Sequence, residues 1–541
     1  MRAFLTLHHP ARAREHYARG LWQADTFYTL LAQHAQARPE ALALRDSRGA
    51  LSWREVQVRA DALAADLNEA GLTPGDRVSL WMSNRNEAVI AFLACSRQGY
   101  ACNPSLHRTY TVAEIVELLG RLGSAAFITE PGWGADGAQV SLEERLADLP
   151  VLRKVYDAAA GLPQAGPAPP APPHSDPDTV AYLAFTSGTT GAPKCVMHSS
   201  NTLMANPRDM VRDWGVDTRT RLLTLSPLSH HIAWVAVSQW LLSGCELIID
   251  DPPAGQSKLD WLIETAATYV MGVPTHAMDM LAEQQRRELA RLGDVQTFYM
   301  AGSPIPPSVA AAFVEQGIKP QNVYGMTENS SHQYTHPDDD TETIVQTCGR
   351  GGPAYAIRIF DSENPDIELG VNEVGQIGGH GAALMLGYFG NQEATESSFN
   401  RDGWFLSGDL GSLDEQGNLH VVGRLKDMVI RGGHNIYPSH VEAVAVRHPR
   451  VDKVAIFAVP DERLGERACI AIEGSAEPAE LLAHLGKQGV SRYDMPEYFL
   501  RVEGFPLTAS GKILKRELVE RARRGELTLT PIRYQPSEET S

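Results

Sequence analysis

The most constraining feature of this 541-residue sequence is a strand pattern that runs directly into a loop of glycines and hydroxyl residues. Residues 179–185 read Thr-Val-Ala-Tyr-Leu-Ala-Phe, a β-branched and aromatic run typical of a buried strand. The loop that follows comprises Thr186, Ser187, Gly188, Thr189, Thr190, Gly191, Ala192 and Pro193 and ends at Lys194. Glycines let backbone N–H groups approach an anion, hydroxyls donate hydrogen bonds and lysine adds positive charge. The segment therefore suits a polyphosphate.

Two other interpretations of this loop have to be weighed. A Walker A loop requires an adjacent Gly-Lys pair followed by Ser or Thr. Here Gly191 and Lys194 are not adjacent and Cys195 follows the lysine, so that motif is absent. The second alternative is a plain Gly- and Thr-rich turn between two elements. Only the rest of the chain decides between a turn and a ligand loop.

Composition excludes several classes of protein. The chain is 43% hydrophobic and 21% charged, as soluble globular proteins are, and its length calls for at least two domains. A net charge of −18 argues against nucleic acid or an anionic membrane as the main partner. The six cysteines are scattered, so neither a disulfide framework nor a zinc site is indicated. With no signal peptide pattern and no apolar run of membrane-spanning length, we expect a cytoplasmic protein without an integral membrane segment.

The order of patterns predicts an α/β fold with two domains. Strand and helix patterns alternate through most of the chain, which indicates mainly parallel sheets with helices on both faces. Residues 349–387 are dense in glycine and β-formers and suggest a small twisted antiparallel sheet or a β-barrel-like subdomain. We place a domain boundary between residues 425 and 426. It separates a large N-terminal domain, residues 1–425, from a small mobile α+β domain, residues 426–541.

Taken together, five ordered motifs give the chain a family resemblance. They are the 186–194 loop, Gly-Ser-Pro at 302–304, Tyr-Gly-Met-Thr-Glu at 324–328, Ser-Gly-Asp-Leu at 407–410 and Pro-Leu-Thr-Ala-Ser-Gly-Lys at 506–512. With these motifs, nearly the whole chain resembles the acyl-adenylate-forming, or AMP-binding, superfamily. That superfamily includes acyl-CoA synthetases, adenylation domains of peptide synthetases and beetle luciferases. Order and context together make the resemblance far more specific than any single motif.

The resemblance implies a nucleotide site. It places the 186–194 loop on the β- and γ-phosphates of ATP. In the 324–328 motif, it places Tyr324 against adenine, Thr327 at the α-phosphate and Glu328 on Mg²⁺. Asp409 and Arg424 would take the ribose, and Lys512 would bridge the carboxylate and the α-phosphate. The implied ATP- and AMP-binding residues are Thr186, Ser187, Gly188, Thr189, Thr190, Gly191, Lys194, Gly302, Ser303, Pro304, Tyr324, Gly325, Thr327, Asp409, Arg424 and Lys512. The implied catalytic residues are Lys512, Thr327, Glu328 and His230.

The resemblance also implies the reaction. A carboxylic acid is converted to an acyl-adenylate with release of pyrophosphate, and a thiol then takes the acyl group and expels AMP. Between the half-reactions the small domain swings about a hinge, which matches Lys426. The swing would exchange Lys512 for the loop at Gly432 and Gly433, whose missing side chains leave room for a pantetheine arm.

The acid and the acceptor are less constrained. His230 matches the position that closes the acyl pocket, although the family's Pro-Leu-Phe-His is Pro-Leu-Ser-His here. The expected pocket residues are His230, Trp234, Val273 and Met326, mostly apolar, which favours an apolar monocarboxylic acid. The closest branch is that of cyclohexanecarboxylate-type and medium-chain acyl-CoA ligases. Free coenzyme A is the favoured acceptor and a carrier protein in trans the alternative; a homodimer is compatible with the sequence.

A different class of function also has to be considered. A nucleotide-binding regulator could be built on a ligase scaffold that has lost its activity. That interpretation is disfavoured because Lys512, Glu328 and Asp409 are all present, whereas an inactive scaffold would be free to lose them.

Overall fold

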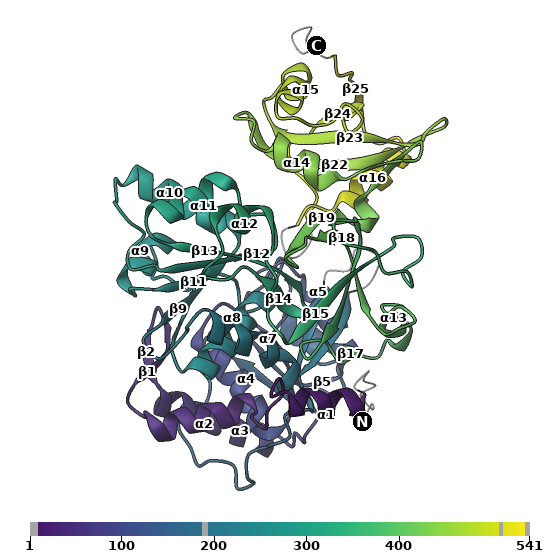
Figure 1. Ribbon diagram of the computed structural model, residues 1–541. Helices are drawn as coiled ribbons and strands as arrows, with labels where there is room; N and C mark the ends of the chain where they lie inside the picture. The colour runs from purple at the N-terminus through teal and green to yellow at the C-terminus, as the bar shows by residue number, and fades with distance from the viewer. Residues whose placement is uncertain (1–8, 187–192, 508–511, 536–541) are drawn as a thin grey trace.

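The computed structural model describes residues 9–186, 193–507 and 512–535 (Figure 1). Four sheets carry the fold, and helices pack against their faces. The larger helices up to residue 346 are α1 (Pro10–Ala18), α2 (Phe27–Ala37), α3 (Trp53–Glu69), α4 (Asn86–Gln98), α5 (Val112–Leu122), α7 (Ser200–Asp213), α8 (His231–Ser243), α9 (Lys258–Glu264), α10 (Pro274–Arg286), α11 (Pro307–Glu315) and α12 (Thr341–Gln346). The short helices α6 (Leu142–Leu146) and α13 (Gln392–Glu396) lie in connections.

The largest sheet has eight strands in the order β14-β13-β12-β11-β9-β10-β1-β2. All neighbours are parallel except the terminal pairs β1–β2 and β13–β14, as the strand–helix alternation predicts. Its strands are β1 (Leu42–Asp46), β2 (Gly49–Ser52), β9 (Arg221–Thr224), β10 (Glu246–Ile249), β11 (Tyr269–Gly272), β12 (Thr297–Ala301), β13 (Lys319–Met326) and β14 (Ser330–Tyr334). The carboxyl ends of β11, β12 and β13 therefore share one edge, where such sheets bind ligands.

The second sheet has seven strands in the order β17-β8-β7-β4-β3-β5-β6. Its strands are β3 (Arg77–Trp81), β4 (Ala101–Asn103), β5 (Ser124–Thr129), β6 (Lys154–Asp157), β7 (Val180–Thr186), β8 (Lys194–Ser199) and β17 (Gly387–Tyr388). The strand expected before the glycine–threonine loop is β7, and it pairs antiparallel with β8. Residues 163–178 contain no helix or strand, as their proline-rich composition predicts.

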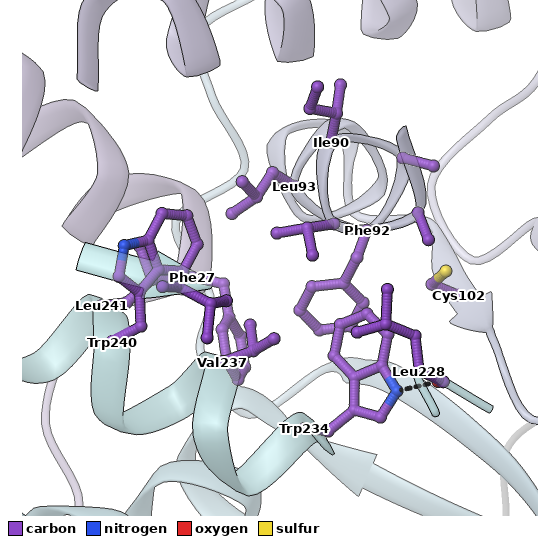
Figure 2. Close-up of a cluster of buried hydrophobic side chains, with 14 of the residues drawn as sticks. Phe27, Ile90, Phe92, Leu93, Cys102, Leu228, Trp234, Val237, Trp240 and Leu241 are labelled. Atoms are coloured by element: carbon purple, nitrogen blue, oxygen red, sulfur yellow. Dashed lines mark hydrogen bonds between the residues drawn. The ribbon is translucent and has the colours of Figure 1, made fainter. Parts of the chain in front are cut away.

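The core between the two large sheets is built largely around α8 and α4. Trp234 of α8 packs against Phe92 of α4, and Trp240 of α8 stacks on Trp53 of α3; Figure 2 shows Trp234, Val237, Trp240 and Leu241 in this cluster. The Trp234 indole donates a hydrogen bond to the Leu228 carbonyl at 2.7 Å, so its one polar atom is satisfied. This packing holds the amino end of α8 beside the carboxyl ends of the β11–β13 strands.

The two remaining sheets lie in the last third of the chain. One is antiparallel, in the order β15-β16-β18-β19, with β15 (Tyr355–Phe360), β16 (Gly375–Gly381), β18 (Phe405–Leu413) and β19 (Leu419–Arg424). Of the two alternatives for residues 349–387, the sheet is right and the barrel is wrong: within the described residues β15 and β19 are unjoined edges. Closing a barrel would need a ladder between those two strands.

The final sheet has six strands, with the order β21-β20-β23-β24-β25 and β22 paired to β23. It comprises β20 (Val429–Arg431), β21 (His434–Ile436), β22 (Val451–Asp461), β23 (Gly465–Gly474), β24 (Tyr498–Arg501) and β25 (Thr530–Pro531), packed with α14 (Pro438–Ala445), α15 (Pro478–Lys487) and α16 (Lys515–Arg523). It stands above β18 and β19 in Figure 1. Within the described residues, no helix has both the length and the apolar character needed to cross a bilayer.

Candidate active site

A carboxylate, a guanidinium and a phenol meet at the end of the β18–β19 hairpin. Asp409 and Arg424 are register partners on the two strands, and the Arg424 Nε lies 3.4 Å from Asp409 Oδ1. The hydroxyl of Tyr324, from β13, donates to Asp409 Oδ2 at 2.9 Å. Burial raises the pKa of Asp409, whereas Arg424, Tyr324 and Lys512 lower it. The three residues expected at adenine and ribose are thus brought together from two sheets.

Glu328 lies in a second polar cluster beside the first. The hydroxyl of Tyr388 donates to Glu328 Oε1 at 2.9 Å, and the ammonium of Lys194 lies 4.5 Å from the centre of the Tyr388 ring. Burial raises the pKa of Glu328, which Tyr388 and Lys194 lower and Asp409 raises. The lysine that ends the glycine–threonine loop and the glutamate of the 324–328 motif therefore share one site.

Lys512 connects these clusters to the last sheet. Its pKa is lowered, first by desolvation in the cleft and then by the Arg424 cation, while Asp409 and Glu328 raise it. The side chain of Lys512 is exposed, but the surrounding protein still removes part of its hydration. Lys512 thus interacts electrostatically with residues that lie 88 to 184 positions earlier in the chain.

The glycine–threonine loop spans the gap between two paired strands. Thr186 ends β7, Lys194 begins β8, and the two are register partners, with the Thr186 hydroxyl donating to the Lys194 carbonyl at 3.4 Å. Arg121 of α5 donates to the Pro193 carbonyl at 2.8 Å. The predicted phosphate contacts Ser187, Gly188, Thr189, Thr190 and Gly191 lie outside the described residues. Lys194, at one end of the loop, lies near Glu328, and its register partner Thr186 holds the other end of the loop beside it.

Gly302 and Gly325 line the edge of the cleft at the ends of β12 and β13. Gly302 has φ +92° and is exposed together with Ser303 and Pro304. A Cβ on Gly325 would come within 1.8 Å of the Ser330 carbonyl oxygen, so only glycine fits there. Residue 325 must therefore be glycine because the backbone at Ser330, in the following turn, lies too close for any side chain.

Sequence reasoning missed His198, which holds the backbone of the 324–328 motif. This buried histidine on β8 donates from Nε2 to the Thr327 carbonyl at 2.7 Å. Its Nδ1 accepts from the Thr202 hydroxyl at 2.9 Å, which sets the tautomer. Burial lowers the pKa of His198 to about 4, so it is neutral at physiological pH. Its position two residues before α7 carries no motif that could have indicated this contact.

His230 stands at the mouth of the cleft among other histidines. It is the N-cap residue of α8, and its ring centre lies 4.5 Å from that of His107. Desolvation and then the Lys512 charge lower the pKa of His230 to about 4. Desolvation and His230 itself lower the pKa of His107 to about 3, and the His107 Nδ1 lies 3.0 Å from the Ser229 hydroxyl. His107 was not among the sequence candidates.

We predict that His230 contributes no proton transfer near neutral pH. Because its pKa is lowered, the imidazole has already lost its proton below about pH 6 and cannot titrate between about pH 6 and 8. His230→Gln should lower kcat/KM for the acid but leave the shape of the pH profile unchanged. The measurement is pyrophosphate release against pH; an inflection near pH 6.5 that the variant abolishes would contradict the prediction.

The other expected acyl-pocket residues lie at different depths. Val273 caps α10 near Gly302, and Met326 ends β13; both are half-buried. Trp234 is 1% exposed and packs against Phe92 with ring centres 4.5 Å apart, within the core of Figure 2. Trp234 thus lies on the face of α8 turned toward α4, and its contact with the acid stays a prediction.

The expected hinge and tunnel residues lie on the segment between the last two sheets. Lys426 is exposed on the 3₁₀ helix η1 (Leu425–Asp427), which joins β19 to β20. Gly432 and Gly433 form the β20–β21 turn with φ +57° and +87°, and nothing lies within 4 Å of a Cβ placed on Gly433. The nearby helix α14 begins at Pro438 without a side-chain cap, and the Ser439 hydroxyl donates to the Val422 carbonyl.

Comparison with known families identifies the family of this chain. The sequence model of the AMP-binding enzyme family matches residues 31–389, and that of the AMP-binding enzyme C-terminal domain matches residues 440–512. This chain belongs to the AMP-binding enzyme family. The two matches contain most of the residues gathered in the cleft, including Tyr324, Glu328 and Lys512.

Several relatives of this AMP-binding enzyme are similar over almost their whole length. The Escherichia coli medium-chain fatty-acid–CoA ligase is 28% identical over 95% of this chain and 93% of its own. An Amycolatopsis feruloyl-CoA synthase is 32% identical over 90% and 97%, and the Mycobacterium tuberculosis salicyl-AMP ligase/salicyl-S-ArCP synthetase is 29% identical over 94% and 93%. The Bacillus subtilis o-succinylbenzoate CoA synthetase, solved with ATP and magnesium, has a TM-score of 0.80 at 26% identity over 90% and 98%.

The polar groups of this AMP-binding enzyme fit a magnesium ion that is bound partly by substrate. No group of three or more His, Cys, Asp or Glu side chains that could hold a metal occurs in the described part of the chain. Mg²⁺ commonly uses one or two carboxylates together with substrate phosphates. Glu328 supplies such a carboxylate, and one of its oxygens is already oriented by Tyr388. The donor set therefore suits Mg²⁺ delivered with ATP, which would neutralise phosphate charge.

Tyr388, another residue absent from the sequence candidates, should strengthen metal binding by this carboxylate. Tyr388→Phe removes the hydrogen bond to Glu328, and loss of such a supporting contact typically weakens metal affinity about 10- to 100-fold. We expect a higher Mg²⁺ concentration for half-maximal activity with intact folding. The matched control is Tyr156→Phe on the remote edge strand β6, which removes a similar hydrogen bond to Asp66 of α3. Equal magnesium titrations of the two variants would contradict the prediction.

Proposed function

We propose that this enzyme is an ATP-dependent acid:CoA ligase that activates an apolar monocarboxylic acid as its acyl-adenylate. The observation that carries the proposal is the convergence of Tyr324 with two carboxylates, Glu328 and Asp409, and two cations, Arg424 and Lys512. Such a set can hold a ribose, a phosphate chain and a second anion together. Relatives with CoA ligase activity extend over the same length of chain.

The residues suit an in-line displacement without a covalent enzyme intermediate. A carboxylate oxygen attacks the α-phosphorus, the new P–O bond forms, and the bond to pyrophosphate breaks. Lys512 would offset the charge that builds between the two anions, while Asp409 and Arg424 hold the ribose in position. The thiol sulfur then attacks the acyl carbon and AMP leaves as the mixed anhydride is cleaved.

The two half-reactions require different groups at the same place. We assign residues 1–425 and 426–541 as the two domains, with Lys426 as hinge, because η1 lies between sheets that share no ladder. In the structure Lys512 lies near Arg424, Asp409 and Glu328. The C-terminal domain would therefore have to rotate to bring Gly432 and Gly433 to the acyl group. A cytoplasmic location and a homodimer stay predictions from the sequence.

Pyrophosphate release across a panel of carboxylic acids tests the function. We expect ATP to yield AMP and pyrophosphate only with an acid present, and thioester to form when coenzyme A is added. ADP as the product, or no turnover with any acid, would overturn the proposal. Omitting coenzyme A and supplying a phosphopantetheinylated carrier protein tests the alternative acceptor. The salicyl-AMP ligase/salicyl-S-ArCP synthetase relative is the reason to consider this acceptor.

A further inference from the structure

The side chains between α8 and the large sheet show where the cleft ends. Parallel strand pairing places Met271, Tyr299 and Gln321 side by side in one row across β11, β12 and β13. Ala301 and Val323 form the next row toward the cleft. Because side chains alternate along a strand, both rows face the same side of the sheet, and four of these five residues belong to the apolar cluster that includes α8.

Exposure falls to zero between these two rows. Ala301 is 6% exposed and Val323 is 3% exposed, but Tyr299, Met271 and Gln321 are all 0% exposed. The walls of an open pocket keep some accessible surface, because a water-sized sphere fits against them. Along β12, accessible surface therefore extends from exposed Gly302 to Ala301 and ends at the row that contains Tyr299.

Tyr299 is the largest group in that row and is held in place. Its hydroxyl shares a 2.7 Å hydrogen bond with the Ser331 hydroxyl on β14. On the helix side, α8 packs against α7 and, within this sheet, against β9, β10, β11 and β14, so side chains of the intervening β12 and β13 lie beneath it. Ala236 and Gln239 of α8, on the side away from α4, are 0% exposed too. Among the described residues, buried side chains of the sheet and of α8 therefore leave no accessible surface below the Ala301 row.

From this geometry we infer that Tyr299 is the specificity-determining floor of the acyl pocket and restricts the enzyme to short-chain or single-ring acids. The inference rests on the proposed function and names its substrate class. Strands rise about 3.3 Å per residue, so the Tyr299 row lies roughly 10 Å below Gly302, and the phenol ring occupies part of that depth. An extended medium-chain acid would have to displace Tyr299.

The test compares acids of different length by pyrophosphate release. The wild-type enzyme should show a higher kcat/KM with butyrate or benzoate than with octanoate. Tyr299→Ala should raise the octanoate-to-butyrate ratio about tenfold or more, since one methylene in such a pocket already changes kcat/KM about tenfold. Tyr299→Phe keeps the ring and should keep the wild-type preference.

Two further variants separate specificity from damage to the core. Ala301→Val narrows the remaining space and should lower benzoate use relative to propionate; it also decides the question if Tyr299→Ala does not fold. Tyr100→Ala removes another buried tyrosine of the same cluster, whose hydroxyl donates to the Leu72 carbonyl, and should leave the ratios unchanged.

The outcomes are distinct. A wild-type preference for octanoate, or an unchanged ratio in folded Tyr299→Ala, would overturn the inference and leave the proposed function standing. Absence of acid-dependent pyrophosphate release from every variant and from the wild type would overturn the proposed function, and this inference with it.

Discussion

Lys512→Ala is expected to slow acyl-adenylate formation about 10²- to 10³-fold while leaving thioester formation from supplied acyl-adenylate near the wild-type rate. Loss of one preorganised group at a developing charge has effects of that size. Lys512 interacts with Arg424, Asp409 and Glu328 in the arrangement seen here, so its charge is available to the first half-reaction. In the second half-reaction the α-phosphate is no longer being attacked and the lysine has no charge to offset.

Acid-dependent pyrophosphate exchange measures the first step, and consumption of purified acyl-adenylate by coenzyme A measures the second. Lys453→Ala is the matched control, because Lys453 is a cation of the same domain that pairs with Glu473 at 3.0 Å across β22 and β23. A parallel loss of both half-reactions in Lys512→Ala would contradict the use of separate arrangements for the two steps.

Asp409→Ala is expected to raise the KM for ATP about 100-fold or more, with a smaller change in kcat. Hydrogen bonds to a charged group are worth about 1.5–3 kcal/mol each, and this carboxylate is proposed to accept two from the ribose. The variant also leaves the Tyr324 hydroxyl and the Arg424 guanidinium without their shared acceptor. Initial rates against ATP concentration, at saturating acid, give both constants.

The control for this variant comes from the same hairpin. Asp414 lies in the β18–β19 turn and accepts backbone hydrogen bonds from Gln416 and Asn418, away from the cleft. Asp414→Asn should leave the KM for ATP unchanged. If both substitutions raised it equally, the effect of Asp409 would come from a loosened hairpin and not from contact with the nucleotide.

The elements and the order of the motifs could be predicted because they depend on local patterns. β7 appears where its β-branched and aromatic run predicts a strand, and the parallel sheets follow from the strand–helix alternation. The convergence of Tyr324, Asp409 and Arg424 was predicted only through the family resemblance. The barrel was wrong because strand patterns do not say whether the outer strands of a sheet meet.

The sequence by itself determined the chemistry available to this protein: a glycine–threonine loop with its lysine, one glutamate, one aspartate and one late lysine in the order of an AMP-binding enzyme. Tertiary structure alone decided which groups support them, namely His198 under Thr327 and Tyr388 on Glu328, and that Tyr299 closes the space below Ala301. The physical reason is that side-chain contacts between distant segments depend on how sheets and helices pack, and local periodicity carries no record of that packing.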